Sequence, residues 1–236
     1  NIIVADSRGL ITTKREGLDD SKKRYMQDIE ATQLADVIGG ADMFLGLSAA
    51  GILTKAMVKE MAENPIIFAL ANPDPEILPE HAHEVRPDVI MATGRSDYPN
   101  QVNNALCFPY IFRGALDVGA TTINEEMKIA CVHAIARMAH IEADAATYGE
   151  KSASFGRDYL IPRPLDQRLI LEIAPAVAQA AMDSGVAIRP IQDFSAYRQR
   201  LSEFVYNSAF MMKPIFAQAK TAPKRIAYAE GEDQRV

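Results

Sequence analysis

The sequence contains no tryptophan, only two cysteines and no apolar run that approaches the length of a membrane span. A transmembrane helix needs about 20 mostly apolar residues, so no segment is predicted to cross a membrane. Cys107 and Cys131 lie in apolar surroundings without the spacing of metal ligands. This favours buried free thiols in a reducing cytosol over a disulfide framework, and the sequence therefore predicts a cytoplasmic protein.

An excess of positive charge is also absent. Lysine and arginine number 25 against 31 aspartates and glutamates, which gives a net charge of −6. An acidic surface attracts neither nucleic acid nor an anionic membrane, so we expect neither as a partner. Two short basic stretches, Lys14-Arg15 and Lys22-Lys23-Arg24, are the local exceptions. Hydrophobic residues make up 48% of the 236 positions, which is enough for a packed core.

Both ends of the sequence have the character of interior segments. The chain starts at Asn1 and enters an apolar run at once, and residues 225–229 form another short apolar run close to the end. We therefore expect a piece of a longer protein. Neighbouring strands, from the same chain or from another subunit, are expected to cover residues 1–6 and 225–229. We also expect a homo-oligomer.

Short apolar runs alternate with amphipathic stretches in the first part of the chain. Four runs are predicted to be strands, at 2–6, 43–47, 66–70 and 89–92. Residues 30–40 and 54–63 have helical spacing, so the predicted order is βαβαβ and the fold class is α/β. Continuous apolar strands indicate a parallel sheet buried on both faces, with ligands at the carboxyl ends of its strands.

Helical patterns dominate from about residue 124. Asn124 can cap a helix that carries one apolar stripe, and a second helix is predicted over 166–184, where Pro175 should kink or divide it. The segment 145–164 is predicted to be a loop. A third helix is predicted over 194–212, before the terminal strand.

Amides are concentrated in YPNQVNNALCFP, residues 98–109. Adjacent Asn side chains at the start of a helix can donate to a carboxylate or carbonyl, and the backbone N–H groups face the same ligand. Together with VADSRGL at 4–10 and ALANPDPE at 69–76, this stretch resembles the malic enzymes. The resemblance implies a Rossmann-like sheet that is incomplete at its N-terminal edge, because the first strand and the glycine-rich phosphate loop would lie upstream.

The resemblance implies cofactor contacts in two turns. Asp6 would accept hydrogen bonds from the adenine ribose, while Ser7 and Arg8, with Lys14 and Arg15, would suit a 2′-phosphate. Ser48 and Ala49 lie in a turn of small residues that would run along the nicotinamide ribose. Each also has a simpler structural explanation: Asp6 can close a β-turn, the basic residues can form a solvated loop, and residues 46–51 can be a compact turn.

The amides after later strands would bind the substrate side of the same site. In the malic enzymes the Asn that corresponds to Asn72 reaches both nicotinamide and substrate. An isolated Asn-Pro, however, more often forms hydrogen bonds with the backbone of its own loop. By the same resemblance Asn104 binds the substrate carboxylate and Asn103 lies in the cofactor site. Gly94 is expected at the same edge of the sheet.

The implied reaction oxidises malate to pyruvate and CO2 and reduces NADP or NAD, with Mg or Mn as divalent cation. In the family the acid, base and metal ligands precede this part of the chain, so we assign none here. Asp74, Glu76, Glu80 and Asp97 are expected to be solvated turn residues, and His81 and His83 form a poor zinc signal.

The resemblance also predicts the domain organisation. Residues 1–190 would form the NAD(P)-binding domain, 191–220 a helical linker, and 221–236 the start of a phosphate acetyltransferase-like domain, as in the large bacterial malic enzymes. We expect the piece alone to be inactive. One alternative is a noncatalytic ligand-sensing or assembly module. Another is an amino-acid or 2-hydroxy-acid dehydrogenase, which would need a catalytic His or Lys in these loops, where none is found.

Overall fold

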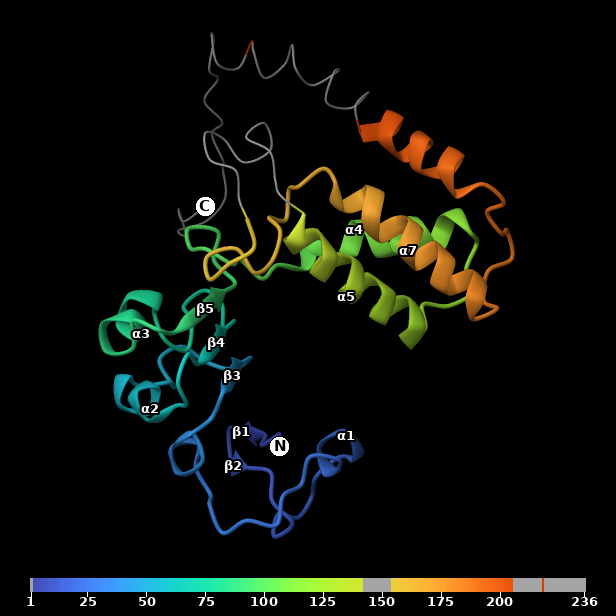
Figure 1. Cartoon of the computed structure of the whole chain (residues 1–236). Coiled ribbons are helices and arrows are strands. Elements are labelled where there is room, and N and C mark those ends of the chain that lie inside the picture. Colours follow the sequence, from blue (N-terminus) through green and yellow to red (C-terminus); the bar gives the residue numbers. More distant parts are fainter. Residues whose placement is uncertain (1, 142–153, 206–217, 219–236) are drawn as a thin grey trace, which may run out of the picture.

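The computed structural model describes residues 2–141, 154–205 and 218. A small parallel sheet with two helices occupies the first part of the chain, and a group of packed helices follows it (Figure 1). The predicted α/β class is confirmed by this arrangement.

Three strands form the parallel sheet, in the order β3 (Met43–Gly46), β4 (Ile66–Ala69) and β5 (Ile90–Thr93). Their last residues lie in one row, since Gly46 pairs with Ala69 and Ala69 pairs with Thr93. Helices α2 (Lys55–Glu60) and α3 (Pro79–Val85) connect the strands. All three strands therefore end at the same edge of the sheet, as the sequence predicted.

The core of this part lies between the sheet and its two helices. Ile67 of β4, Val58 of α2 and Ala82 of α3 are completely buried. Met43 and Leu45 of β3, however, are 47% and 53% exposed. Burial on both faces was therefore wrong for β3, because β3 is an edge strand and no other described element covers that face.

The first predicted strand does not join the parallel sheet. Residues 2–6 contain only the two-residue strand β1 (Ala5–Asp6), which pairs antiparallel with β2 (Gly9–Leu10). Gly9 allows this tight reversal, because its φ of 103° is accessible mainly to glycine and a Cβ there would lie 2.4 Å from the carbonyl oxygen of Thr32. The prediction of 2–6 as a parallel strand was therefore wrong.

The helix predicted over 30–40 is also wrong. This segment holds only the 3-10 turn η1 (Leu34–Asp36), and the helix α1 (Asp20–Lys23) lies before it. The Asp36 carboxylate accepts hydrogen bonds from the backbone N–H groups of Thr32 and Gln33 at 3.0 and 2.9 Å. Such local hydrogen bonds compete with the formation of a longer helix, and Gly39-Gly40 is unfavourable for extending one.

The helical part begins at η2 (Asn104–Leu106) and contains α4 (Phe108–Asp117), α5 (Glu125–His140) and α7 (Leu169–Asp183), followed by helical residues 194–205. Asn124 caps α5 as predicted, accepting from the N–H of Met127 at 3.1 Å. Helix α7 packs against both α4 and α5, and its residues Leu169, Ile173 and Val177 are completely buried.

Pro175 does not divide α7, which runs from Leu169 to Asp183, so a division at this proline was wrong. A proline inside a helix leaves the carbonyl four residues earlier without its donor. That carbonyl belongs to Leu171, and it accepts a hydrogen bond of 2.6 Å from the Arg198 guanidinium. The arginine arrives from the following helical segment, so tertiary structure replaces the missing bond.

Some predictions lie outside the described residues. They are the first part of the loop at 145–164, the end of the helix at 194–212 and the strand at 225–229. Within the described ranges, none of the helices combines the length and the apolar character that a membrane crossing requires.

Replacing Gly114 of α4 by alanine is expected to destabilise the protein. A Cβ at this position would lie 2.5 Å from the carbonyl oxygen of Ala174 and 2.9 Å from the Cβ of Val177, so α4 and α7 would have to separate. Overpacking costs about 1–3 kcal/mol and outweighs the helix propensity gained, about 1 kcal/mol. Urea unfolding of Gly114→Ala should therefore show a lower midpoint than the parent. The control Gly39→Ala, with no atom within 4 Å of its Cβ, should match the parent.

Candidate functional site

Three turns meet the carboxyl edge of the parallel sheet. The turn after β3 contains Ser48 and Ala49, the turn after β4 contains Asn72, and the segment after β5 leads to Asn103 and Asn104. All five residues are exposed. Because the three strands end in one row, these turns emerge side by side from the sheet (Figure 1).

The amides of the 98–109 stretch have different roles. Asn103 caps η2, because its Oδ1 accepts from the N–H of Ala105 at 2.8 Å. The amides of Asn104 and Asn72 form no hydrogen bond to another described residue, which leaves both available to a ligand.

Asn100 instead holds two chain segments together. It is buried and has a φ of 55°, in the left-handed region that asparagine tolerates. Its Nδ2 donates to the carbonyl oxygens of Met91 and Arg157 at 2.9 and 2.7 Å, and its Oδ1 accepts from the N–H of Leu160 at 2.7 Å. This amide has its full set of partners, so its role is structural.

Glu76 is the main residue that sequence reasoning misplaced. It was predicted to be a solvated turn residue, but it is 0% exposed. Its Oε1 accepts from the N–H of Ser48 at 2.9 Å and its Oε2 from the N–H of Ala71 at 3.0 Å. Backbone donors thus replace the water that a carboxylate normally binds. The sequence signal that could have indicated burial is the apolar Ile77 directly after it.

An ion-pair group links the turns after β4 and β5. The Arg95 guanidinium pairs with Asp97 at 2.6 Å and lies 3.9 Å from Asp74 in the neighbouring turn. The arginine lowers the pKa of Asp97 below its ordinary value. Tyr98 donates to Glu80 at 3.0 Å, which joins the same segment to α3. These exposed pairs are individually weak, and Arg95–Asp74 is the one that runs between the two turns.

Asp6 lies on the separate β1–β2 hairpin, in a basic setting. Each carboxylate oxygen has two donors: Oδ1 accepts from the Arg8 N–H at 2.9 Å and Arg15 at 2.8 Å, and Oδ2 accepts from Arg15 at 3.1 Å and Lys22 at 2.9 Å. Arg15 above all, then Lys22, holds the pKa of Asp6 well below its usual range. A ribose hydroxyl would have to replace one of these donors.

The Asp6 carboxylate is paired with two cations, and Arg8 lies exposed beside it. Arg15 and Lys22 form these two ion pairs, and the side chains of Ser7 and Arg8 are exposed. Lys14, the other predicted phosphate ligand, pairs with Glu30 at 2.5 Å. An anion could therefore approach Arg8 without displacing a described partner.

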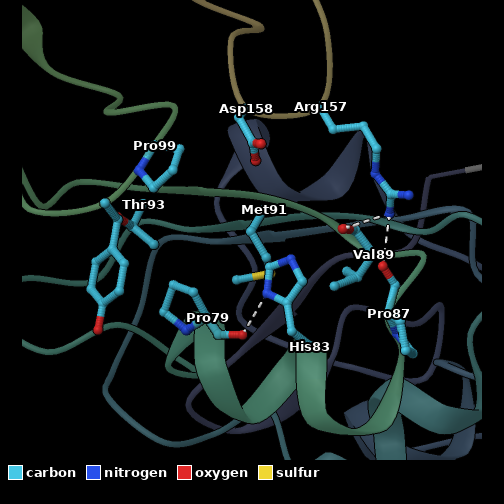
Figure 2. A pocket seen from close by; sticks show the side chains of 10 residues that line it. Pro79, His83, Pro87, Val89, Met91, Thr93, Pro99, Arg157 and Asp158 are labelled. Carbon is cyan, nitrogen blue, oxygen red and sulfur yellow. Dashed lines mark hydrogen bonds between the residues drawn. The ribbon is translucent and has the colours of Figure 1, made fainter.

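A cavity of about 260 Å³ lies beside β5 and α3 (Figure 2). Two of its polar groups contact backbone carbonyls: His83 Nδ1 lies 2.8 Å from the carbonyl oxygen of Pro79, and Arg157 donates to the carbonyls of Pro87 and Val89 at 3.2 and 3.0 Å. No residue predicted to bind cofactor or substrate lines this cavity. The exposed turns at the strand ends are therefore the better candidate site.

Two thiols meet beneath the start of α4. The sulfur atoms of Cys107 and Cys131 are 3.4 Å apart, with Cys107 half-buried and Cys131 buried. The Cys131 thiol donates toward Cys107 and lowers the pKa of Cys107 to about 7. The Cys107 N–H bonds to the carbonyl oxygen of Asn104 at 3.0 Å, so this pair supports the segment that carries the amides.

Metal ligands were not predicted in this chain. Within residues 2–141, 154–205 and 218, no three His, Cys, Asp or Glu side chains gather closely enough to hold a metal ion.

Comparison with known proteins identifies relatives along the whole chain. The family model described as malic enzyme, NAD binding domain, matches residues 1–149. The NADP-dependent malic enzyme of Salmonella typhimurium is 60% identical over 100% of this chain, which covers 32% of that protein. The NAD-dependent malic enzyme of Rhizobium meliloti is also 60% identical, and the chain covers 31% of it. The chain thus spans about a third of the length of these curated relatives.

Solved structures agree with these sequence matches. A malic enzyme from Entamoeba histolytica aligns over 95% of this chain and 46% of its own, with a TM-score of 0.76 and 29% identity. A malic enzyme from Pyrococcus horikoshii aligns over 79% of this chain and 40% of its own, with a TM-score of 0.64 and 36% identity.

Alkylation of Cys107 is expected to depend on pH with a midpoint near the pKa of about 7. The thiol is protonated and unreactive below this midpoint, whereas the reactive thiolate predominates above it. Iodoacetamide labelling from pH 5.5 to 9.5, quantified by mass spectrometry of the Cys107 peptide, measures the midpoint. In Cys131→Ala the donor is lost, so the midpoint should move up toward the ordinary thiol range. Equal midpoints in both proteins would contradict this cause.

Proposed function

The chain belongs to the family of malic enzyme NAD-binding domains, and from this membership we propose that it is the NAD(P)-binding part of a malic enzyme. The full-length protein would oxidise malate to pyruvate and CO2 and reduce NADP or NAD. The observation that carries this proposal is the family match over residues 1–149, which includes all three turns at the carboxyl edge of the sheet. The relatives named above support the same activity.

The proposed cofactor site combines the hairpin and the sheet edge. Asp6, Ser7 and Arg8 would hold the adenosine end, and Ser48, Ala49, Asn72 and Asn103 would lie along the nicotinamide end. The exposed turn of small residues after β3 supports this role, because backbone there can approach a flat ligand closely. When bound, the nicotinamide supplies the acceptor for the hydride that leaves C2 of malate.

The proposed substrate contacts are Asn72 and Asn104. Each amide can donate to a carboxylate of malate, and each lacks a partner among the described residues. Orientation of the substrate by such donors lowers the barrier without any proton transfer by the amides themselves. The acid, the base and most ligands of the Mg or Mn ion would come from residues outside this chain. The ion would polarise the keto group of the oxidised substrate during loss of CO2.

Cofactor preference for NADP is supported by charge. The guanidinium of the exposed Arg8 forms no ion pair with a described residue, so it can pair with the 2′-phosphate that NAD lacks. We therefore propose NADP as the preferred cofactor.

We also propose the domain organisation outlined from the sequence. Residues 1–190 would form the NAD(P)-binding domain and 191–220 a helical linker to a phosphate acetyltransferase-like domain that starts at 221–236. Helical residues 194–205 support the linker. The family match ends at residue 149, before the proposed boundary.

Asn104→Ala is expected to lower kcat/KM for malate by about 10- to 100-fold, the equivalent of one lost hydrogen bond to a charged group, roughly 1.5–3 kcal/mol. Reduction of NADP and NAD by the full-length protein, with malate and Mg²⁺ or Mn²⁺, is followed by absorbance. The control Gln192→Ala removes an exposed amide outside the site and should leave the constants unchanged. Absence of malate-dependent reduction by the parent with either cofactor would refute the proposed function.

Arg8→Ala is expected to raise KM for NADP by about 10-fold or more and to change KM for NAD little, because only NADP carries the phosphate that the guanidinium would bind. The measurement is a comparison of both cofactors at saturating malate. Arg200→Ala, which removes another exposed arginine, provides the control. An equal change for NADP and NAD would show that Arg8 does not discriminate between them.

A further inference from the structure

A buried carboxylate joins two of the turns that carry proposed ligand-binding residues. Glu76 lies between them, and it is completely buried. One oxygen accepts from the N–H of Ser48, in the turn after β3, and the other accepts from the N–H of Ala71, next to Asn72 in the turn after β4. The carboxylate therefore spans the gap between two strand ends.

The backbone on either side of Glu76 continues the same connection. Gly51 donates to the carbonyl oxygen of Pro75 at 3.2 Å, and Leu53 donates to that of Glu76 at 3.1 Å. The backbone N–H groups of three residues after β3 thus donate hydrogen bonds to residues 75 and 76. These three are Ser48, Gly51 and Leu53. The two turns form one hydrogen-bonded unit.

The chemistry of the site requires a carboxylate. Among the described residues no lysine or arginine forms an ion pair with Glu76, and its oxygens accept from two backbone N–H groups and, at 3.5 Å, from the Ser48 hydroxyl. A carboxylate only accepts, and it can meet two separate N–H groups with its two oxygens. A glutamine has one acceptor oxygen and an NH₂ group that would face the other donor. An aspartate would be one methylene shorter.

Gly46 gives an independent indication that this contact is tight. A Cβ at the last residue of β3 would lie 2.4 Å from Cδ and 2.5 Å from Oε1 of Glu76. The carboxylate cannot swing aside, because hydrogen bonds hold both of its oxygens. The strand end and the carboxylate therefore determine each other's position.

We propose that Glu76 is a positioning residue for the NAD(P) site, acting through Ser48 and Ala49 on one side and Asn72 on the other. This inference rests on the proposed function. Glu76 does not touch the ligands itself; it sets the spacing between the turns that do. Loss of one of its two backbone hydrogen bonds leaves the fold of the sheet in place and loosens the cofactor side of the site.

The first test compares Glu76→Gln with the parent in the full-length protein. Misplacement of binding groups by about 1 Å can cost up to 100-fold, so kcat/KM for NADP should fall by about 10- to 100-fold, with a higher KM for the cofactor. The control Glu84→Gln removes an exposed carboxylate of α3 and should match the parent. Parent-like constants in Glu76→Gln overturn the positioning role, whereas an inactive parent overturns the proposed function.

A second measurement does not depend on activity. Hydrogen–deuterium exchange of the full-length protein should be faster in Glu76→Gln at residues 46–53 and 69–76, and unchanged in the helices α5 and α7. Unchanged exchange in both turns overturns the inference even if activity falls. A uniform increase throughout the protein also overturns it, because that result indicates general destabilisation.

Coupling between Gly46 and Glu76 provides a third test. Gly46→Ala should impair NADP binding in the parent, because its Cβ meets the held carboxylate. In a Glu76→Ala background those atoms are gone, so the same substitution should have a much smaller effect on KM. Additive effects in the two backgrounds would exclude the contact as the cause.

Discussion

The two backbone hydrogen bonds accepted by the buried Glu76 carboxylate connect the turns after β3 and β4 at the carboxyl edge of the parallel sheet. Strand pairing ends at Gly46 and Ala69, and beyond these residues the chain leaves the sheet in turns whose ligand-binding candidates are exposed. Such turns contribute little packing of their own. The buried Glu76 carboxylate connects the first two turns by hydrogen bonds. The ion pair between Arg95 and Asp74 extends the connection to the turn after β5.

The segment after β5, which carries Asn103 and Asn104, is held by the parallel sheet at one end and by the helical core at the other. Val102 donates to the carbonyl oxygen of Thr93 at 2.8 Å, next to the isolated parallel bridge between Thr93 and Gln101, while Leu106 is buried among the helices. Asn103 and Asn104 lie between these two anchors. The close approach of α4 to α7 at Gly114, and the Arg198 bond that lets α7 run through Pro175, therefore also support the amides at the sheet edge.

Charge is distributed in accordance with the proposed ligands. The chain is acidic overall, yet the hairpin that carries Asp6 collects Arg8, Arg15 and Lys22, and exposed uncharged amides lie at the sheet edge. A phosphate-bearing cofactor would meet cations at one end and neutral donors at the other. This arrangement separates recognition of the cofactor from orientation of the substrate, because an amide can bind a carboxylate without the strong field of a lysine.

The sequence by itself determined the class of fold, the strands β3, β4 and β5 and the residues that follow them. Strands and turns are indicated by the spacing of apolar residues and by turn-forming residues, and both signals lie within a few neighbouring positions. It also carried the resemblance to the malic enzymes. Only the tertiary structure decided that Glu76 is buried, that β1 turns back on β2, and that α7 continues through Pro175. Each of these depends on a donor, acceptor or steric neighbour from a distant segment, namely Ser48, Thr32 and Arg198, and a local pattern contains no information about such partners.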